Sequence, residues 1–260
     1  MPERYADELT VARQIAYEAG EIMRRYFYID QHITKKADGT SVTIADTEVN
    51  SMVIARLQQA FPADGVIGEE ESTAEYGSGR LWFCDPIDGT KAYTWRVPTA
   101  MFSLGLVVDG EPVLGVCYEP MTDRLYTAVR GQGAVCNNMP IRVNEKPLAT
   151  GIVGTTSSQF RIRRRASYLD ALLDQRVEMA AFSGAVSMIM RVAEGVFVAY
   201  FEDLVNAHDV AASQVILEEA GGILTAPDGS RLDYSKPFRG ALSTNTVVRD
   251  EMLAILRDAA

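Results

Sequence analysis

Two aspartates, Asp85 and Asp88, lie three positions apart in the segment WFCDPIDGTKAY, where a run of apolar residues ends. Pro86 removes a backbone donor between them, which predicts that the strand ends there, and Gly89 allows another group to approach the backbone closely. The residues after Gly89 can begin a helix, whose first amide groups favour an anion. The segment therefore offers two carboxylates, the Ile87 carbonyl and an anion pocket, although a capped turn at the end of a strand is the simpler alternative.

Three further acidic positions strengthen the interpretation as a metal site. Glu69 opens the acidic run in GEEES after a short apolar segment, and Asp46 and Asp209 each stand where a helix begins. Solvated loop residues and helix N-caps are the alternative interpretations. Carboxylates and a bound anion repel each other unless a divalent cation lies between them, and such oxygen ligands favour Mg²⁺ or Mn²⁺ over zinc. If these residues converge, they can hold two cations about 4 Å apart, as two-metal phosphoryl chemistry requires.

The elements that must position these residues are predicted from hydrophobic spacing. Apolar residues recur every three or four positions over 9–27, and again from Asp46 up to Pro62, which predicts two helices. Short strands follow, including a hairpin with its turn at Asp109-Gly110. The second half alternates strand and helix, which is typical of an α/β layer.

Length and charge limit the possible classes of protein. The 260 residues suffice for a hydrophobic core, and we expect one domain over 1–260 with a soft boundary near 147–150. A formal net charge of −10 disfavours binding to nucleic acid polymers or to anionic membranes, and no apolar run reaches the ~18–20 residues of a membrane helix. Three scattered cysteines, expected to be buried free thiols, and a polar N-terminus unlike a signal peptide predict a cytoplasmic protein.

Four segments together resemble the signatures of the inositol monophosphatase superfamily. DPIDGT (85–90) is similar to its central signature, HDVAASQVILEEAGG (208–222) is similar to its C-terminal one, and VTIADTEVN and GEEES are similar to the other two. The resemblance covers nearly the whole chain. It implies a layered αβαβα sandwich of the α+β or α/β class, as in fructose-bisphosphatase-like folds. It also implies a homodimer that hydrolyses a small phosphorylated metabolite.

The resemblance further implies a mechanism and a set of site residues. Two or three Mg²⁺ ions, with Mn²⁺ as a substitute, would activate a water that attacks phosphorus directly, without a covalent intermediate. The implied cation ligands are Glu69, Asp85, the Ile87 carbonyl, Asp88 and Asp209. The implied catalytic residues are Glu69 and Thr90, which position the water, and Asp46, which is hydrogen-bonded to Thr90. The implied substrate contacts are Asp88, Gly89, Thr90, Ser183, Ala185 and Glu202.

Some residues depart from the family pattern or suit more than one role. His208 stands where the family usually has Trp, and either packs there or touches the leaving group. Lys91 resembles the residue that follows this motif in histidinol-phosphate and adenosine-bisphosphate phosphatases, or is a solvated residue at a helix start. The basic run 161–165 either faces the substrate or lies in solvent, and Arg191 is expected to be a buried ion-pair partner.

The sequence therefore predicts a Mg²⁺-dependent phosphatase for a small phosphate monoester, with inositol monophosphate as the first candidate. The alternatives that keep the chemistry are histidinol phosphate, adenosine 3′,5′-bisphosphate and fructose 1,6-bisphosphate. A catalytically silent binding protein on the same fold is an alternative of another class. It is disfavoured because every implied cation ligand is present in the sequence.

Overall fold

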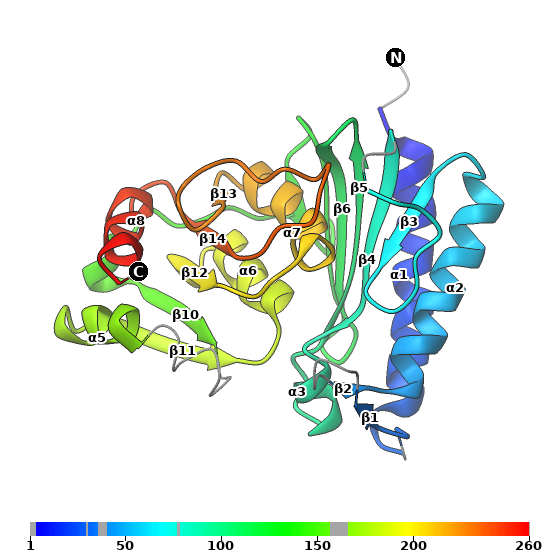
Figure 1. Ribbon diagram of the computed structural model, residues 1–260, viewed down its shortest axis with the longest axis horizontal. Coiled ribbons are helices and arrows are strands. Elements are labelled where there is room, and N and C mark those ends of the chain that lie inside the picture. The colour runs from blue at the N-terminus through cyan, green and yellow to red at the C-terminus, as the bar shows by residue number, and fades with distance from the viewer. Residues whose placement is uncertain (1–3, 30, 36–40, 77–78, 157–165, 260) are drawn as a thin grey trace.

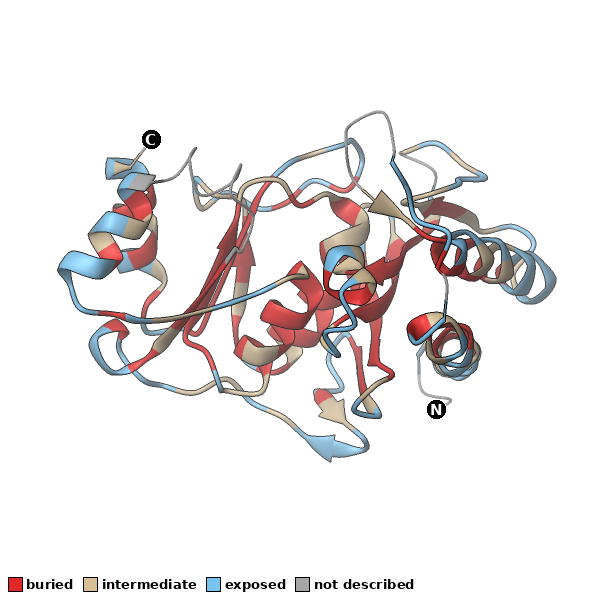
Figure 2. Cartoon of the chain, turned by 90° about the horizontal axis from the view of Figure 1, so that it is seen from below, coloured by how far each residue is buried: buried red, intermediate tan, exposed pale blue. Residues whose placement is uncertain are grey.

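Two β-sheets alternate with three layers of helices (Figure 1). A computed structural model describes residues 4–29, 31–35, 41–76, 79–156 and 166–259. Viewed from below, buried residues fill both sheets and the helices between them, whereas the outer helices expose one face (Figure 2). The predicted layered αβαβα sandwich is confirmed.

The larger sheet holds the strands of the first half of the chain. Its strands are β3 (Gly65–Gly68), β4 (Arg80–Asp88), β5 (Met101–Val108), β6 (Glu111–Glu119), β7 (Arg124–Val129), β8 (Ala134–Cys136) and β9 (Met139–Pro140), in that order across the sheet. β3 pairs with β4 in parallel, and all later neighbours pair antiparallel. The predicted hairpin is confirmed, because Asp109 and Gly110 join β5 to β6, both with the positive φ that such turns need.

The smaller sheet holds the strands of the second half. Its strands are β10 (Ile152–Thr156), β11 (Glu178–Phe182), β12 (Ala199–Glu202), β13 (Ile223–Thr225) and β14 (Ala241–Thr244), in the order β11-β10-β12-β14-β13. The pairs of β10 with β11 and with β12 are parallel, whereas β14 is antiparallel to both neighbours. The short remaining elements are β1 (Thr34–Lys35), β2 (Ser41–Val42), α3 (Thr90–Thr94) and the 3₁₀ helix η1 (Leu148–Thr150).

Helices α1 (Ala6–Phe27) and α2 (Ile44–Ala60) cover the outer face of the larger sheet (Figure 1). α1 buries Ile15, Ala19 and Met23, whose spacing of four places them on one side of the helix, as predicted. The smaller sheet is covered on its outer face by two more helices, α5 (Ala166–Asp174) and α8 (Arg249–Asp258).

The middle layer consists of α6 (Ala185–Ala193) and α7 (Ala207–Glu219), which contact both sheets. α7 lies very close to the larger sheet, because a Cβ on Gly115 of β6 would lie 2.2 Å from the Ala212 carbonyl oxygen. Only glycine permits this approach, which fixes the height of α7 over the sheet. The chain passes to the second sheet at η1, near the predicted soft boundary. The single domain stays a prediction, which the shared helix layer supports.

No helix within the described ranges combines the length and the apolar character that a membrane crossing requires. Cys84 and Cys117 are buried free thiols, as the sequence predicts, and Cys136 is a free thiol that is partly exposed.

Candidate active site

Strand β4 carries the first two aspartates. The prediction that this strand ends at Pro86 is wrong, because β4 continues to Asp88 through a bulge, where its pairing with β5 shifts between Asp85 and Asp88. Pro86 lies inside the bulge, where the ladder does not need its missing N–H. The Ile87 N–H donates instead to Asp85 Oδ1 at 3.0 Å. The bulge thus brings two carboxylates of one strand to the same point.

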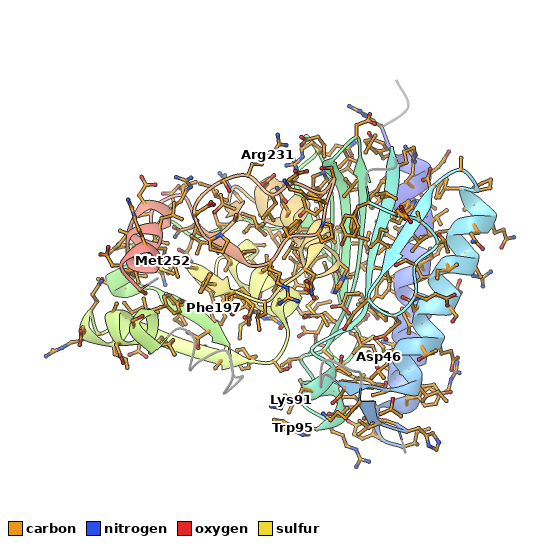
Figure 3. All side chains as sticks on the ribbon, in the orientation of Figure 1. Asp46, Lys91, Trp95, Phe197, Arg231 and Met252 are labelled. Carbon is orange, nitrogen blue, oxygen red and sulfur yellow. The ribbon has the colours of Figure 1, made fainter. Side chains whose placement is uncertain are left out.

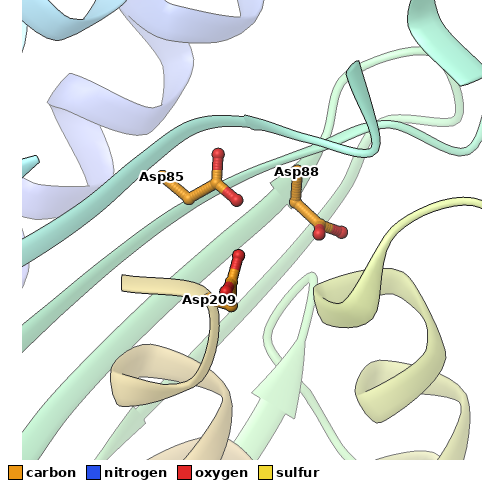
Figure 4. Close-up of side chains that lie close together, drawn as sticks. All are labelled: Asp85, Asp88 and Asp209. Atoms are coloured by element: carbon orange, nitrogen blue, oxygen red, sulfur yellow. The ribbon is translucent and has the colours of Figure 1, made fainter. Parts of the chain in front are cut away.

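Asp209 reaches this point from the first turn of α7. Oxygen atoms of Asp85, Asp88 and Asp209 lie within 4.8 Å of one another, although the residues come from two different layers (Figure 4). Asp209 is not the N-cap of its helix. The N-cap is Asn206, whose backbone N–H donates to Asp209 Oδ2 at 2.5 Å. This bond holds the carboxylate in place beside the other two aspartates.

Asp46 lies in the first turn of α2, and it too is not the N-cap. The N-cap is Thr43, whose N–H and hydroxyl donate to Asp46 Oδ2 at 2.8 and 2.5 Å. The Thr90 hydroxyl lies 3.4 Å from Asp46 Oδ1 and 3.0 Å from the Ile87 carbonyl oxygen, so it can donate to either. Asp46 (labelled in Figure 3) therefore connects α2 to the start of α3, and its charge acts on Asp85 of the carboxylate cluster.

These carboxylates accumulate negative charge away from water. Burial raises the pKa of Asp85 well above its ordinary value, and the charges of Glu69, Asp88 and Asp209 raise it further. Burial and the Asp209 charge raise the pKa of Asp88 to about 7, against backbone amides of α6 that lower it. Burial also raises the pKa of Asp46 to about 7, against two hydrogen bonds that lower it. A divalent cation at this point would remove the repulsion that these shifts report.

Glu69 follows β3 and lies beside the cluster without belonging to its tightest part. Its backbone N–H donates to the Cys84 carbonyl at 3.1 Å, which places it next to Asp85 on the neighbouring strand. Its charge raises the pKa of both Asp85 and Asp46. Among the described residues, the cluster within 4.8 Å consists of the three aspartates and does not include Glu69.

The beginning of α6 packs against the motif that follows β4. The Ala185 N–H donates to Asp88 Oδ1 at 2.8 Å, and the Ser187 N–H donates to Oδ2 at 3.3 Å. A Cβ on Gly89 would lie 2.8 Å from the Ser183 carbonyl oxygen. The structure therefore places Ser183 and Ala185 beside the site, as expected from the sequence. It adds a contact that sequence reasoning missed, because no local pattern shows that α6 amides hold Asp88.

Replacing Gly89 with alanine is expected to destabilise the protein. Gly89 has φ 79°, and its Cβ would meet the backbone oxygen of Ser183, which cannot move away like a flexible side chain. Gly131→Ala is the matched control, because Gly131 has φ 82° with nothing within 4 Å of its Cβ. We expect Gly89→Ala to cost at least ~1 kcal/mol more unfolding free energy in urea than the control. Equal losses for the two variants would show that the contact with Ser183 does not matter.

Glu202 and His208 are candidate site residues from the second half of the chain. Glu202 is 2% exposed at the end of β12, and its Oε1 accepts the Asp203 N–H at 3.0 Å. His208 is mostly buried, and its Nε2 lies 3.8 Å from Asp209 Oδ1. This position is compatible with both roles that the sequence left open for His208.

Lys91 projects from α3 with its ammonium 4.6 Å from the centroid of the Trp95 ring, and both side chains are exposed (Figure 3). This contact is a cation–π interaction at the surface, so Lys91 is neither fully solvated nor bound to a carboxylate in the described structure. The basic run 161–165 lies outside the described residues.

Comparison with known proteins identifies what this arrangement resembles. The sequence model of the inositol monophosphatase family matches residues 5–259. The chain is 32% identical to inositol monophosphatase 2 of Solanum lycopersicum, over 96% of this chain and 97% of that protein. It is 35% identical to a histidinol-phosphatase of Mycobacterium tuberculosis, over 96% of this chain and 98% of that protein. The solved inositol monophosphatase of Anabaena (Nostoc) superposes with a TM-score of 0.83 at 27% identity, covering 97% and 96% of the two chains.

Proposed function

The chain belongs to the inositol monophosphatase family, and we propose that it hydrolyses a small phosphate monoester with the help of Mg²⁺. The observation that carries the proposal is the group of Asp85, Asp88 and Asp209, whose oxygens lie within 4.8 Å of one another. Burial raises the pKa of Asp85 and of Asp88, so this group is costly unless a cation compensates it.

The donor atoms at this point suit Mg²⁺, with Mn²⁺ as a substitute, because all of them are oxygens. We propose that Glu69, Asp85 and the Ile87 carbonyl would hold one cation, and that Asp85, Asp88 and Asp209 would hold a second. Bound cations would supply charge neutralisation on the phosphate and lower the pKa of water. The number of ions, two or three, belongs to this proposal.

The residues of the chain itself orient the reactants. Thr90 and Glu69 would position the attacking water, and Asp46 would hold the Thr90 hydroxyl, which lies 3.4 Å from Asp46 Oδ1. The Gly89 and Thr90 amides, at the start of α3, would bind phosphate oxygens. Since Thr90 at the start of α3 would contact both the water and the phosphate, while Glu69 after β3 would contact only the water, their alignment depends on the fit between β3 and α3.

The leaving group would lie on the side of the site that the second half of the chain forms. We propose that Ser183, Ala185 and Glu202 contact its hydroxyl groups, with inositol monophosphate as the first candidate substrate. Histidinol phosphate is the second candidate, because a histidinol-phosphatase is 35% identical to this chain and Lys91 departs from the inositol-specific pattern. Adenosine 3′,5′-bisphosphate and fructose 1,6-bisphosphate complete the set.

A side-by-side assay of these four phosphate esters with Mg²⁺ tests the proposal. We expect inositol monophosphate to exceed each of the others by at least ~10-fold in kcat/KM, about 1.4 kcal/mol of transition-state discrimination. A larger value for histidinol phosphate would reassign the substrate and keep the reaction. No hydrolysis of any ester, in a protein that binds Mg²⁺, would support a silent binding protein instead.

The family membership also supports a homodimer, and the free cysteines support a cytoplasmic location. Sedimentation that shows only monomer would remove the homodimer. The net charge of −10 supports a small-molecule substrate over a nucleic acid polymer or a membrane.

A further inference from the structure

The two ends of α6 bind to two different parts of the larger sheet. At its beginning, the Ala185 and Ser187 N–H groups donate to the two oxygens of Asp88. The N-cap residue is Gly184, which has no side chain of its own that could cap the helix. The carboxylate of Asp88 therefore takes the place of a capping side chain, so a shift of this end of α6 would also shift the donors around Asp88.

At its other end, α6 is tied to the sheet by Arg191. The guanidinium group donates from Nη2 to both carboxylate oxygens of Glu119, at 2.9 Å each, and Glu119 is the last residue of β6. Nη1 donates to Glu194 Oε1 at 2.7 Å and to the Tyr126 hydroxyl at 3.3 Å. The expectation that Arg191 is an ion-pair partner is confirmed, although its side chain is only partly buried. Hydrogen bonds between two charged groups, as in this pair, are shorter and stronger than those between neutral groups.

Other contacts also hold α6 against the larger sheet. Glu194, which follows α6, binds Arg124 of β7, and buried apolar side chains of α6 such as Val186 and Ile189 pack in the core. Glu119 is 1% exposed, so little water surrounds its charge, and the Arg191 guanidinium is its counter-ion. The Arg191–Glu119 pair is thus a charge-assisted contact between the last turn of α6 and the end of β6.

We propose that Arg191 is a positioning residue that acts through α6 on Asp88. α6 has nine residues, a rigid rod of about 13 Å, so holding its last turn on β6 also holds its first-turn amides on Asp88. The inference rests on the proposed function, because it assumes that Asp88 binds a cation. The inference is that the Arg191–Glu119 ion pair, at the other end of α6, keeps Asp88 in the position that binds the cation.

Measuring Mn²⁺ binding by electron paramagnetic resonance, with Mn²⁺ alone as the probe, tests this proposal without any assay of activity. We expect Arg191→Met to raise the Mn²⁺ dissociation constant by about 10-fold, equivalent to ~1.4 kcal/mol. Loss of a positive charge would by itself strengthen cation binding at an acidic site. Weaker binding would therefore report a change of position and not of charge.

Two further variants separate positioning from stability. Arg191→Met combined with Glu119→Gln removes the carboxylate that would otherwise remain buried without its partner. We expect this double variant to recover thermal stability but to keep the weakened Mn²⁺ binding. Arg80→Met is the matched control, because Arg80 pairs with Asp64 and Glu8 at the opposite end of β4, and we expect it to lose stability with unchanged Mn²⁺ binding.

Wild-type Mn²⁺ affinity in the double variant would overturn the inference, and so would an equal loss of affinity in Arg80→Met. The double variant also decides the question if Arg191→Met alone does not fold. A wild-type protein that binds no Mn²⁺ or Mg²⁺ would overturn the proposed function together with this inference. If the wild type binds Mn²⁺ and the Arg191 variants bind it with the same dissociation constant, only the role of Arg191 would be overturned.

Discussion

Replacing Asp88 with asparagine is expected to lower kcat/KM by about a thousandfold or more, equivalent to ~4 kcal/mol of transition-state stabilisation. Asp88 belongs to the three-aspartate cluster, and its two oxygens accept the Ala185 and Ser187 N–H groups. Asparagine has nearly the same shape, but it carries no charge to hold a cation. Its NH₂ group would also face one of the two N–H donors that the carboxylate accepts.

The same substitution is expected to leave the cation-free protein as stable as the wild type. Burial and the charge of Asp209 raise the pKa of Asp88, which means that the ionised form is already disfavoured there. Removing that charge relieves repulsion and offsets the lost hydrogen bond. The measurements are kcat/KM at saturating Mg²⁺ and the midpoint of thermal unfolding in a chelator.

Asp64→Asn is the matched control for Asp88→Asn. The Asp64 side chain is 4% exposed, but its carboxylate binds Arg80 and the Trp82 indole far from the cluster. We expect this variant to lose stability and to keep its kcat. Near-wild-type turnover of Asp88→Asn would contradict the proposed role of the cluster.

The sequence was most informative where the signal is local. The turn at Asp109-Gly110 and the amphipathic spacing within α1 depend on residues close in the chain, and the structure has both. The acidic motifs were found for the same reason, since each is a short run with unusual composition. Their role as cation ligands stays a prediction, although three of them lie together in the described structure.

The features that sequence reasoning missed depend on contacts between distant segments. The bond from the Ala185 N–H to Asp88 joins residues 97 positions apart, and no periodicity reveals it. The bulge at Pro86 was missed because a proline within a strand normally indicates its end. The alternative interpretation of Asp46 as an N-cap is wrong, because the N-cap is Thr43, and an acidic residue at a helix start satisfies the same pattern at either position.

Removing divalent cations is expected to abolish hydrolysis and to lower the thermal stability of the folded protein. A ligand that binds only the folded state stabilises it by ~2.7 kcal/mol at about 100 times its dissociation constant, which corresponds to roughly 5–10 °C for a chain of this size. We expect a shift of this order when Mg²⁺ is added to the chelated protein. KCl at the same ionic strength is the control, because screening of charge alone would act through either salt.

The size of the Mg²⁺ shift should depend on pH in a defined direction. Burial raises the pKa of Asp88 and of Asp46 to about 7 from 3.8, so the folded state binds protons more tightly than the unfolded state. Without a cation, the stability that comes from these protons is complete below about pH 4 and is lost as the pH rises through about 7. Protons and Mg²⁺ compete for the oxygens of Asp88, and a nearby cation also favours the ionised form of Asp46, so the thermal shift should be larger at about pH 8 than at about pH 5.5. An equal shift at both pH values, or an equal shift with KCl, would show that Asp88 does not bind the cation.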